Sequence, residues 1–543
     1  MAKSFYSVLI TMWYLLIANT TFAYTHADTL RGSNGNGRNW WDVQHYSLSV
    51  IFDTAHKSIS GNVGMQFAIT QNPHDSLQID LQAPMVLDSV VMEGKALDIV
   101  NDSNVWWVKY PFHNLARGTG KELHMYYHGM PIIARRPPWD GGFIWGKDSL
   151  DKAWISVACQ GLGASAWWPC KDVQWDEPDQ GMSMSFTYPK GLYIVSNGKL
   201  LSKNAVENDF EQATWSVKNP INIYNTTFYM GDYIHWTDTI MGEKGQLDLD
   251  FYVLRQNEAK ARKQFEIVKQ MLHSFEYWMG PYPFYEDGYK LVEAPYLGME
   301  HQSAIAYGNE YMMGYKGKDL SSTGVGLLFD FIIVHESGHE WFGNNITTKD
   351  IADNWIHEGI TTYSETLFIE SVFGKDKAYE YIRGQMQDEK NDRPVTGDYG
   401  VNKEGSGDMY NKGAALIHMI RVIMNDDEKF RQILRGLNKD FYHQTVTTQQ
   451  VEKYINDHSG MDFTPLFNQY LRTADIPTLE YYMKGTKFYY HFANVVPGFT
   501  LPMTMSSGEY GSAIQPSAEW KHISWNQGFN ISFSKDFLIN IKQ

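Results

Sequence analysis

Two histidines and a glutamate form the clearest chemical pattern in this sequence. His335, Glu336 and His339 read H-E-x-x-H, and two apolar runs, residues 327–329 and 331–334, lead into them without a proline. On a helix, residues four positions apart lie on one face. The spacing therefore aims two imidazoles at one point, as a zinc ion requires, and places Glu336 where it can take a proton from an attacking water.

A catalytic zinc site also needs a third protein ligand and an open fourth position. Glu358 follows His339 by nineteen residues, after a short polar loop over residues 347–350. That distance lets the first helix end, a loop turn, and a second helix present a carboxylate to the first. We predict one zinc ion per chain, held by His335, His339 and Glu358. Glu365, two helical turns after Glu358, is a candidate partner for the ring of a ligand histidine.

The ligand spacing and its flanks resemble the gluzincin aminopeptidases, the family of aminopeptidase N and leukotriene hydrolase. The similar segments are Trp341-Phe342-Gly343-Asn344 after the first motif and Trp355-Ile356-His357-Glu358-Gly359 around the third ligand. His357 stands where the family usually has asparagine. The resemblance implies a zinc-dependent aminopeptidase that hydrolyses N-terminal residues from peptides, with peptides that have a free N-terminus as its partners.

Residues outside the metal motif also match the family. Gly298, Met299 and Glu300 match its Gly-x-Met-Glu-Asn strand, and His301 replaces the final asparagine. Gln160 matches a glutamine or glutamate of the family's β domain. The resemblance implies that these residues bind substrate, and that Glu300 and Gln160 hold the substrate's α-ammonium group.

Tyr410 is the last site residue that the resemblance supplies. It precedes Lys412-Gly413 as the family's catalytic tyrosine does, and is implied to donate a hydrogen bond to the tetrahedral oxyanion. Other functions stay open for the same residues. A zinc endopeptidase or an epoxide hydrolase would use the same metal site, and an inactive, zinc-stabilised binding module would keep it without catalysis.

The elements that position these residues fall into three regions. From about residue 40 to 245, apolar residues alternate with polar ones, as at Tyr46, Leu48 and Val50, which indicates a large β domain built as sheet on sheet. Apolar residues three and four apart then predict a helix over residues 257–279. Strand-like composition returns near the C-terminus.

We therefore predict a multidomain α+β protein. It comprises an N-terminal β-sandwich or saddle domain (24–246), a thermolysin-like helical catalytic domain (247–475) and a small C-terminal β-sandwich (476–543). Many relatives continue into a large helical domain that covers the site, and we expect a short form without it.

The composition and the N-terminal segment indicate where the protein is located and which partners are unsuited to it. Residues 1–23 read as a signal peptide, with Lys3 before an apolar stretch, so we expect export to the periplasm or the extracellular space and no stable membrane span in the mature chain. The net charge of -16 argues against nucleic acid as a partner. The two cysteines, Cys159 and Cys170, could pair in an oxidising compartment, and the sequence leaves this open.

Overall fold

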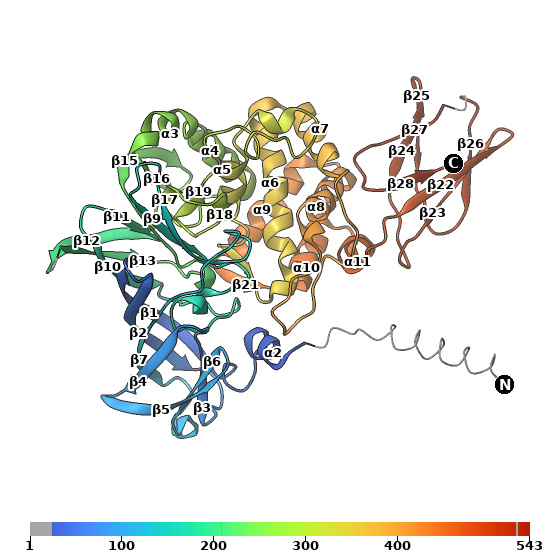
Figure 1. The fold of residues 1–543 in the computed structure, drawn as a ribbon. Coiled ribbons are helices and arrows are strands. Elements are labelled where there is room, and N and C mark those ends of the chain that lie inside the picture. The colour runs from blue at the N-terminus through green and yellow to red at the C-terminus, as the bar shows by residue number, and fades with distance from the viewer. Residues whose placement is uncertain (1–23, 208, 528–529) are drawn as a thin grey trace, which may run out of the picture.

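The structure is a computed structural model that describes residues 24–207, 209–527 and 530–543 (Figure 1). The predicted signal peptide, residues 1–23, lies outside the described residues. A β-rich N-terminal part, a helical part and a C-terminal pair of sheets follow one another along the chain, which confirms the predicted multidomain architecture.

Two sheets and a short helix, α2 (His26–Gly32), form the N-terminal part. Its strands are β1 (Trp41–Asp53), β2 (Ser58–Ile69), β3 (Ser76–Asp80), β4 (Val86–Met92), β5 (Lys95–Asp102), β6 (Val105–Lys109), β7 (Gly120–Gly129), β8 (Gly142–Lys147), β9 (Ala153–Ala158), β10 (Met182–Pro189), β11 (Tyr193–Ser196), β12 (Lys199–Val206), β13 (Phe210–Val217) and β14 (Phe228–Gly231). The large sheet has the order β12-β13-β10-β1-β2-β7-β4-β5-β6-β3, and the small one β11-β14-β9-β8.

The two N-terminal sheets pack face to face through aromatic side chains. The rings of Phe52 and Phe186 on the large sheet lie 4.7 and 6.0 Å from the ring of Phe228 on the small sheet. Alternation along β1 and β10 places these rings on one face, as the period-two pattern predicted. Cys159 and Cys170 are buried in this core and unpaired.

A mixed sheet joins the N-terminal part to the helices. It consists of β15 (Tyr233–Gly242), β16 (Gly245–Leu254), β17 (Tyr289–Glu293), β18 (Gly298–Met299) and β19 (Ile305–Tyr307), in the order β15-β16-β17-β19-β18. The predicted division after residue 246 falls within the β15–β16 hairpin. Strand β18, which carries Gly298 and Met299, lies at the edge of this sheet.

The helical part is organised around one buried helix, α6. The helices are α3 (Glu258–Gln264), α4 (Ile267–Met279), α5 (Phe331–Gly338), α6 (Trp355–Phe373), α7 (Lys375–Gln385), α8 (Asn411–Met424), α9 (Asp427–Asp440), α10 (Thr448–Ser459) and α11 (Thr464–Arg472), with β20 (Ile346–Thr348) paired to β21 (Gln444–Val446). Helix α6 contacts α4, α5, α7 and α8, and is buried continuously from Trp355 to Ile369. Polar side chains on such a helix need partners inside the protein, so they point to a function or a network.

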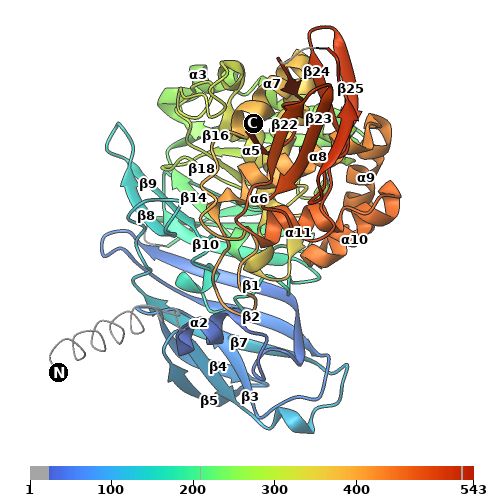
Figure 2. The same cartoon turned by 90° about the vertical axis from the view of Figure 1, so that its right-hand side faces the viewer.

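The C-terminal region is a small pair of sheets, as predicted. Its strands are β22 (Thr478–Lys484), β23 (Lys487–Ala493), β24 (Met503–Ser507), β25 (Tyr510–Ile514), β26 (Lys521–Ser524), β27 (Ser532–Phe533) and β28 (Asn540–Lys542). Phe533 of one sheet packs on Tyr481 of the other, with ring centroids 5.3 Å apart. These sheets lie beside α8 and α11, where the hydroxyl of Tyr470 donates a hydrogen bond to the carbonyl of Leu538 at 2.6 Å (Figures 1 and 2).

No helix in the described part of the chain is both long enough and apolar enough to cross a membrane.

Candidate metal centre and active site

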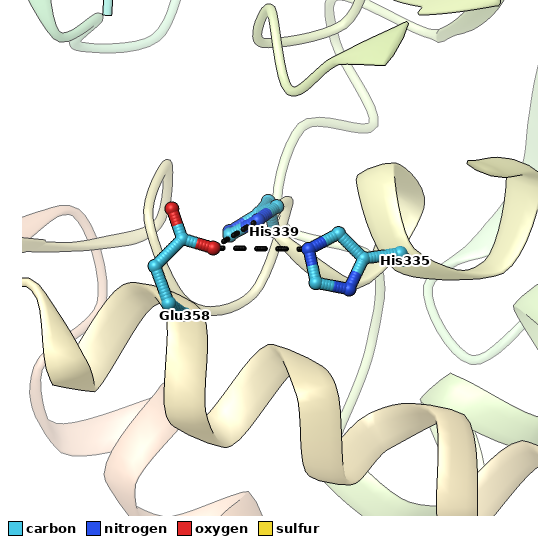
Figure 3. A group of neighbouring side chains, drawn as sticks. All are labelled: His335, His339 and Glu358. Atoms are coloured by element: carbon cyan, nitrogen blue, oxygen red, sulfur yellow. Dashed lines mark ion pairs between the residues drawn. The ribbon is translucent and has the colours of Figure 1, made fainter. Parts of the chain in front are cut away.

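The three predicted metal ligands meet between α5 and α6, with their side chains directed at one another (Figure 3). The Nε2 atoms of His335 and His339 lie 3.7 and 3.3 Å from Oε2 of Glu358. A tetrahedral zinc ion with bonds of about 2 Å holds its ligand atoms roughly 3.3 Å apart. The three donors therefore have the chemistry and the spacing of a zinc site.

One carboxylate oxygen of Glu358 has no hydrogen-bond donor in the described part of the chain and is available to a cation. Its Oε1 accepts a hydrogen bond from Nε2 of Gln160 at 3.0 Å. Its Oε2 is buried and accepts no hydrogen bond from any residue that the structure describes. A buried carboxylate oxygen without a donor is costly unless a charge compensates it, so this atom fits a metal ligand.

Each histidine uses its other ring nitrogen to fix its orientation. Nδ1 of His335 lies 2.7 Å from Oε1 of Glu365, and Nδ1 of His339 lies 3.0 Å from the carbonyl oxygen of Phe342. Both partners are acceptors, so each Nδ1 donates a hydrogen bond to its partner, and Nε2 is the ring nitrogen that a metal would bind, directly or by displacing a proton.

Glu365 is itself held in place, at a fully buried position on α6. Its Oε2 accepts hydrogen bonds from the hydroxyl of Tyr381 at 2.6 Å and from Nε2 of Gln385 at 3.0 Å. The predicted contact between Glu365 and a ligand histidine is therefore present, and two further donors keep this carboxylate from moving.

Charges in the cluster shift the titration of its members. Burial by itself lowers the pKa of His339, but the carboxylate of Glu358 more than offsets this and raises it to about 9. Burial raises the pKa of Glu336 to about 7, against the opposing charge of His335. A carboxylate that titrates near neutrality is suited to take up a proton and return it.

Gly298 allows strand β18 to pass close to the carboxylate of Glu336. A Cβ atom at this position would lie 2.6 Å from Oε1 of Glu336 and 2.8 Å from Cγ2 of Ile332. Any side chain here would displace the carboxylate, so glycine is required by the close approach. The next residue, Met299, is buried in the core of the N-terminal sheets and also lines the pocket.

A glutamine bridges two carboxylates at one end of the site. Nε2 of Gln160 donates to Oε1 of Glu300 at 2.7 Å as well as to Glu358. The hydroxyl of Tyr224 donates to the same oxygen of Glu300 at 3.1 Å, and Nδ2 of Asn344 donates to the Glu300 carbonyl at 2.8 Å. The site thus brings Gln160, which follows β9, and Glu300, which follows β18, together where a substrate ammonium could contact both.

Sequence analysis did not single out Tyr224 or assign a role to Asn344. Tyr224 is one of 34 tyrosines and belongs to no motif near it in the chain, so nothing in the sequence marks it. Asn344 lies in the segment after H-E-x-x-H that resembles the family, and its membership of this segment is the signal that could have marked it as a site residue.

The two histidines that replace family asparagines do not line the pocket. Nδ1 of His301 lies 2.6 Å from the hydroxyl of Tyr229, which itself donates to the carbonyl of Ala304. Nε2 of His357 accepts a hydrogen bond from the backbone N–H of Thr348 at 2.8 Å. Burial lowers the pKa of both histidines to about 3, so both are neutral. They serve packing and backbone contacts beside the site.

Tyr410 lines the same pocket from the start of α8. Its ring lies 6.1 Å from the ring of His335, centroid to centroid. Burial raises the pKa of its hydroxyl well above the ordinary value, so the hydroxyl stays protonated and can donate. The oxyanion contact of Tyr410 stays a prediction.

The pocket around these residues has a volume of about 410 Å³. Tyr315, Leu320 and Phe331 are among its apolar lining residues. Trp139 and Glu404, which the sequence analysis did not single out, lie among the remaining lining residues. Glu404 belongs to the loop before Tyr410 and to none of the matched motifs.

Comparison with known proteins gives consistent results. Residues 263–470 match the family described as "Peptidase family M1 domain". "Probable aminopeptidase 1" of Sulfurisphaera tokodaii is 19% identical over 369 residues, which are 64% of this chain and 43% of the relative. The chain spans well under half the length of the curated relatives it matches, from 30% to 43% of it.

Two solved structures share the fold. A variant of an M1 zinc metallopeptidase from Deinococcus radiodurans, bound to a Tyr-Ser-Ala substrate, has a TM-score of 0.68 at 20% identity and covers 81% of this chain and 96% of its own. Legionella pneumophila aminopeptidase A in complex with aspartic acid has a TM-score of 0.76 at 17% identity, covering 93% of this chain and 60% of its own.

Proposed function

We propose, from the peptidase family M1 domain that this chain carries, that the protein is a zinc-dependent aminopeptidase removing N-terminal residues from peptides. One observation carries the proposal: the buried cluster of His335, His339 and Glu358 lies directly beside the Gln160–Glu300 pair. The relatives are named aminopeptidases, so an endopeptidase, an epoxide hydrolase or an inactive binding module is not favoured.

His335, His339 and Glu358 would hold one zinc ion per chain. When bound, zinc lowers the pKa of water and polarises a carbonyl group. Glu336 faces the same space from α5, so it can take a proton from the attacking water and return it to the leaving amine. Tyr410 would donate a hydrogen bond to the oxyanion that develops on the carbonyl oxygen.

Glu300 and Gln160 would make the enzyme an exopeptidase. Glu300 offers a negative charge, and Gln160 offers an amide oxygen, to a substrate's α-ammonium. A charge-assisted hydrogen bond there binds and orients a substrate whose first residue is free. An internal peptide bond has no ammonium group to offer, so it gains nothing from this contact.

The proposal is tested with a panel of aminoacyl fluorogenic amides, each with a free or an acetylated N-terminus, before and after a zinc chelator. We expect hydrolysis of the free amides alone, lost with the chelator and restored by added zinc. Comparable cleavage of the acetylated amides would favour an endopeptidase. Zinc binding without hydrolysis of any substrate would favour a binding module.

Replacing Glu300 with alanine should lower kcat/KM for aminoacyl amides by about 10- to 100-fold, because a charged hydrogen bond of about 1.5–3 kcal/mol is lost. Cleavage of N-blocked peptides, where measurable, should change little. The measurement is kcat/KM on both substrate types with zinc content determined in parallel. An equal loss on both types would contradict a role in ammonium recognition.

The proposal includes export. Its support is the composition of residues 1–23, with Lys3 ahead of an apolar stretch of signal-peptide length. A periplasmic or extracellular aminopeptidase would act on peptides outside the cytoplasm.

A further inference from the structure

Glu404 is a carboxylate in the active-site pocket that the mechanism above does not use. Its Oε1 accepts a hydrogen bond from Nδ2 of Asn354 at 3.1 Å. No ion pair within about 4 Å joins it to a described residue. The guanidinium of Arg393, whose charge still acts on Glu404, donates to the carbonyl of Gly405 at 2.8 Å and lies 3.7 Å from Asp392. A poorly hydrated carboxylate without a cation is unfavourable unless a ligand supplies one.

The surroundings of Glu404 place it at the amine end of the pocket. Asn354, its hydrogen-bond donor, directly precedes α6 and lies four residues before Glu358. In the same loop as Glu404, Nδ2 of Asn402 donates to the carbonyl of Gly161 at 3.3 Å, next to Gln160. The loop therefore rests against the segment that presents Gln160.

The charges of the pocket leave Glu404 unmatched after substrate binds. A bound zinc ion would supply two positive charges to Glu358 and Glu336, and the α-ammonium of a substrate would face Glu300. Glu365 is held by hydrogen bonds from Nδ1 of His335 at 2.7 Å and from Tyr381 and Gln385. No lysine or arginine is among the described residues that line the pocket. Glu404 is then the carboxylate of the pocket that has no cationic partner among the described lining residues, and a second cationic group of the substrate could pair with it.

The pocket also offers a surface against which the methylene groups of a long substrate side chain can pack. Trp139 lines it and is 67% exposed, with Pro138 beside it in the chain. An indole ring packs against methylene groups and attracts a cation held near its face. A long side chain that ends in a positive charge combines both contacts.

We infer that Glu404 selects substrates whose first residue is lysine or arginine, by pairing with the cationic end of that side chain. The inference rests on the proposed aminopeptidase function and specifies its substrate class. Burial and the charge of Glu358 raise the pKa of Glu404 to about 7, and a bound cation would favour its ionised form.

Lysyl and norleucyl fluorogenic amides provide a matched test, since their side chains share the same stem and differ in the terminal ammonium. We expect the wild-type enzyme to prefer the lysyl amide by about 10-fold or more in kcat/KM, and Glu404→Gln to remove most of that preference. The norleucyl rate should stay within about 3-fold of wild type. Glu389→Gln is the control, because Glu389 is a half-buried carboxylate on a neighbouring segment that does not line the pocket.

Other outcomes decide against the inference. Equal losses on both amides would make Glu404 an α-ammonium or structural contact, and a wild-type enzyme without a lysyl preference would overturn its selectivity directly. Calorimetric binding of lysine amide and norleucine amide to the zinc-loaded protein distinguishes a failure of the Glu404 inference from a failure of the proposed aminopeptidase function. If no amide is hydrolysed but lysine amide binds more tightly than norleucine amide, and Glu404→Gln abolishes that difference, the aminopeptidase proposal fails and the Glu404 contact stands. Equal binding of the two amides overturns the Glu404 contact.

Discussion

Replacing Glu336 with glutamine is expected to lower kcat by about 10²–10⁴-fold, the range that a positioned general base supplies. Glutamine keeps the size and the hydrogen-bonding capacity of the side chain but cannot accept a proton. Because His335, His339 and Glu358 are unchanged, zinc content should remain that of the wild type. The measurement is steady-state kinetics on an aminoacyl amide, with metal analysis of the same preparation.

The control for this variant is a glutamate outside the site. Glu310 lies on the surface and pairs with Lys316 at 3.0 Å, so Glu310→Gln should retain full activity. If Glu336→Gln retained more than about a tenth of the wild-type kcat with zinc bound, the general-base role would be wrong. Loss of zinc in this variant would instead show that the carboxylate helps to hold the metal.

Replacing Tyr410 with phenylalanine should lower kcat by about 10²–10³-fold, the cost of removing one donor to an oxyanion. The aromatic ring beside His335 is preserved, and only the hydroxyl is lost. Since the hydrogen bond strengthens in the transition state, KM should change by less than about 3-fold. The kinetic constants are best measured on two substrates of different reactivity.

A second tyrosine tests whether the effect is specific to Tyr410. Tyr277 is an exposed residue on α4, and Tyr277→Phe should leave kcat unchanged. If Tyr410→Phe raised KM and left kcat intact, the hydroxyl would be a substrate-binding group and not an oxyanion donor. Unchanged zinc content would exclude an indirect effect through His335.

The metal centre was largely predictable because its geometry is local. The spacing of His335 and His339 needs only one helical turn, which α5 and the residue after it provide. Glu358 required a second helix to begin soon after the first, and α6 begins at Trp355. Glu365 follows from the periodicity of the same helix. Each of these positions depends on backbone geometry that the sequence specifies over short distances.

The amine end of the pocket was less accessible to sequence reasoning. Gln160 and Glu300 were assigned by their resemblance to family motifs, and the structure brings Nε2 of Gln160, after β9, to 2.7 Å from Oε1 of Glu300, after β18. Tyr224 and Glu404 belong to no motif. Tyr224 contacts Glu300 and Glu404 lines the pocket because segments distant in the chain pack together, and such contacts leave no periodic signal.

The sequence by itself determined the pair of imidazoles, the carboxylate opposite them and the base beside them, because helical geometry relates these residues over short separations. The tertiary structure decided which tyrosine meets Glu300, that His301 and His357 turn away from the pocket, and that Glu404 lines it. Those outcomes depend on how separate segments pack, as where Tyr224 meets Glu300 and Asn354 meets Glu404, and composition and spacing carry no geometric information about such contacts.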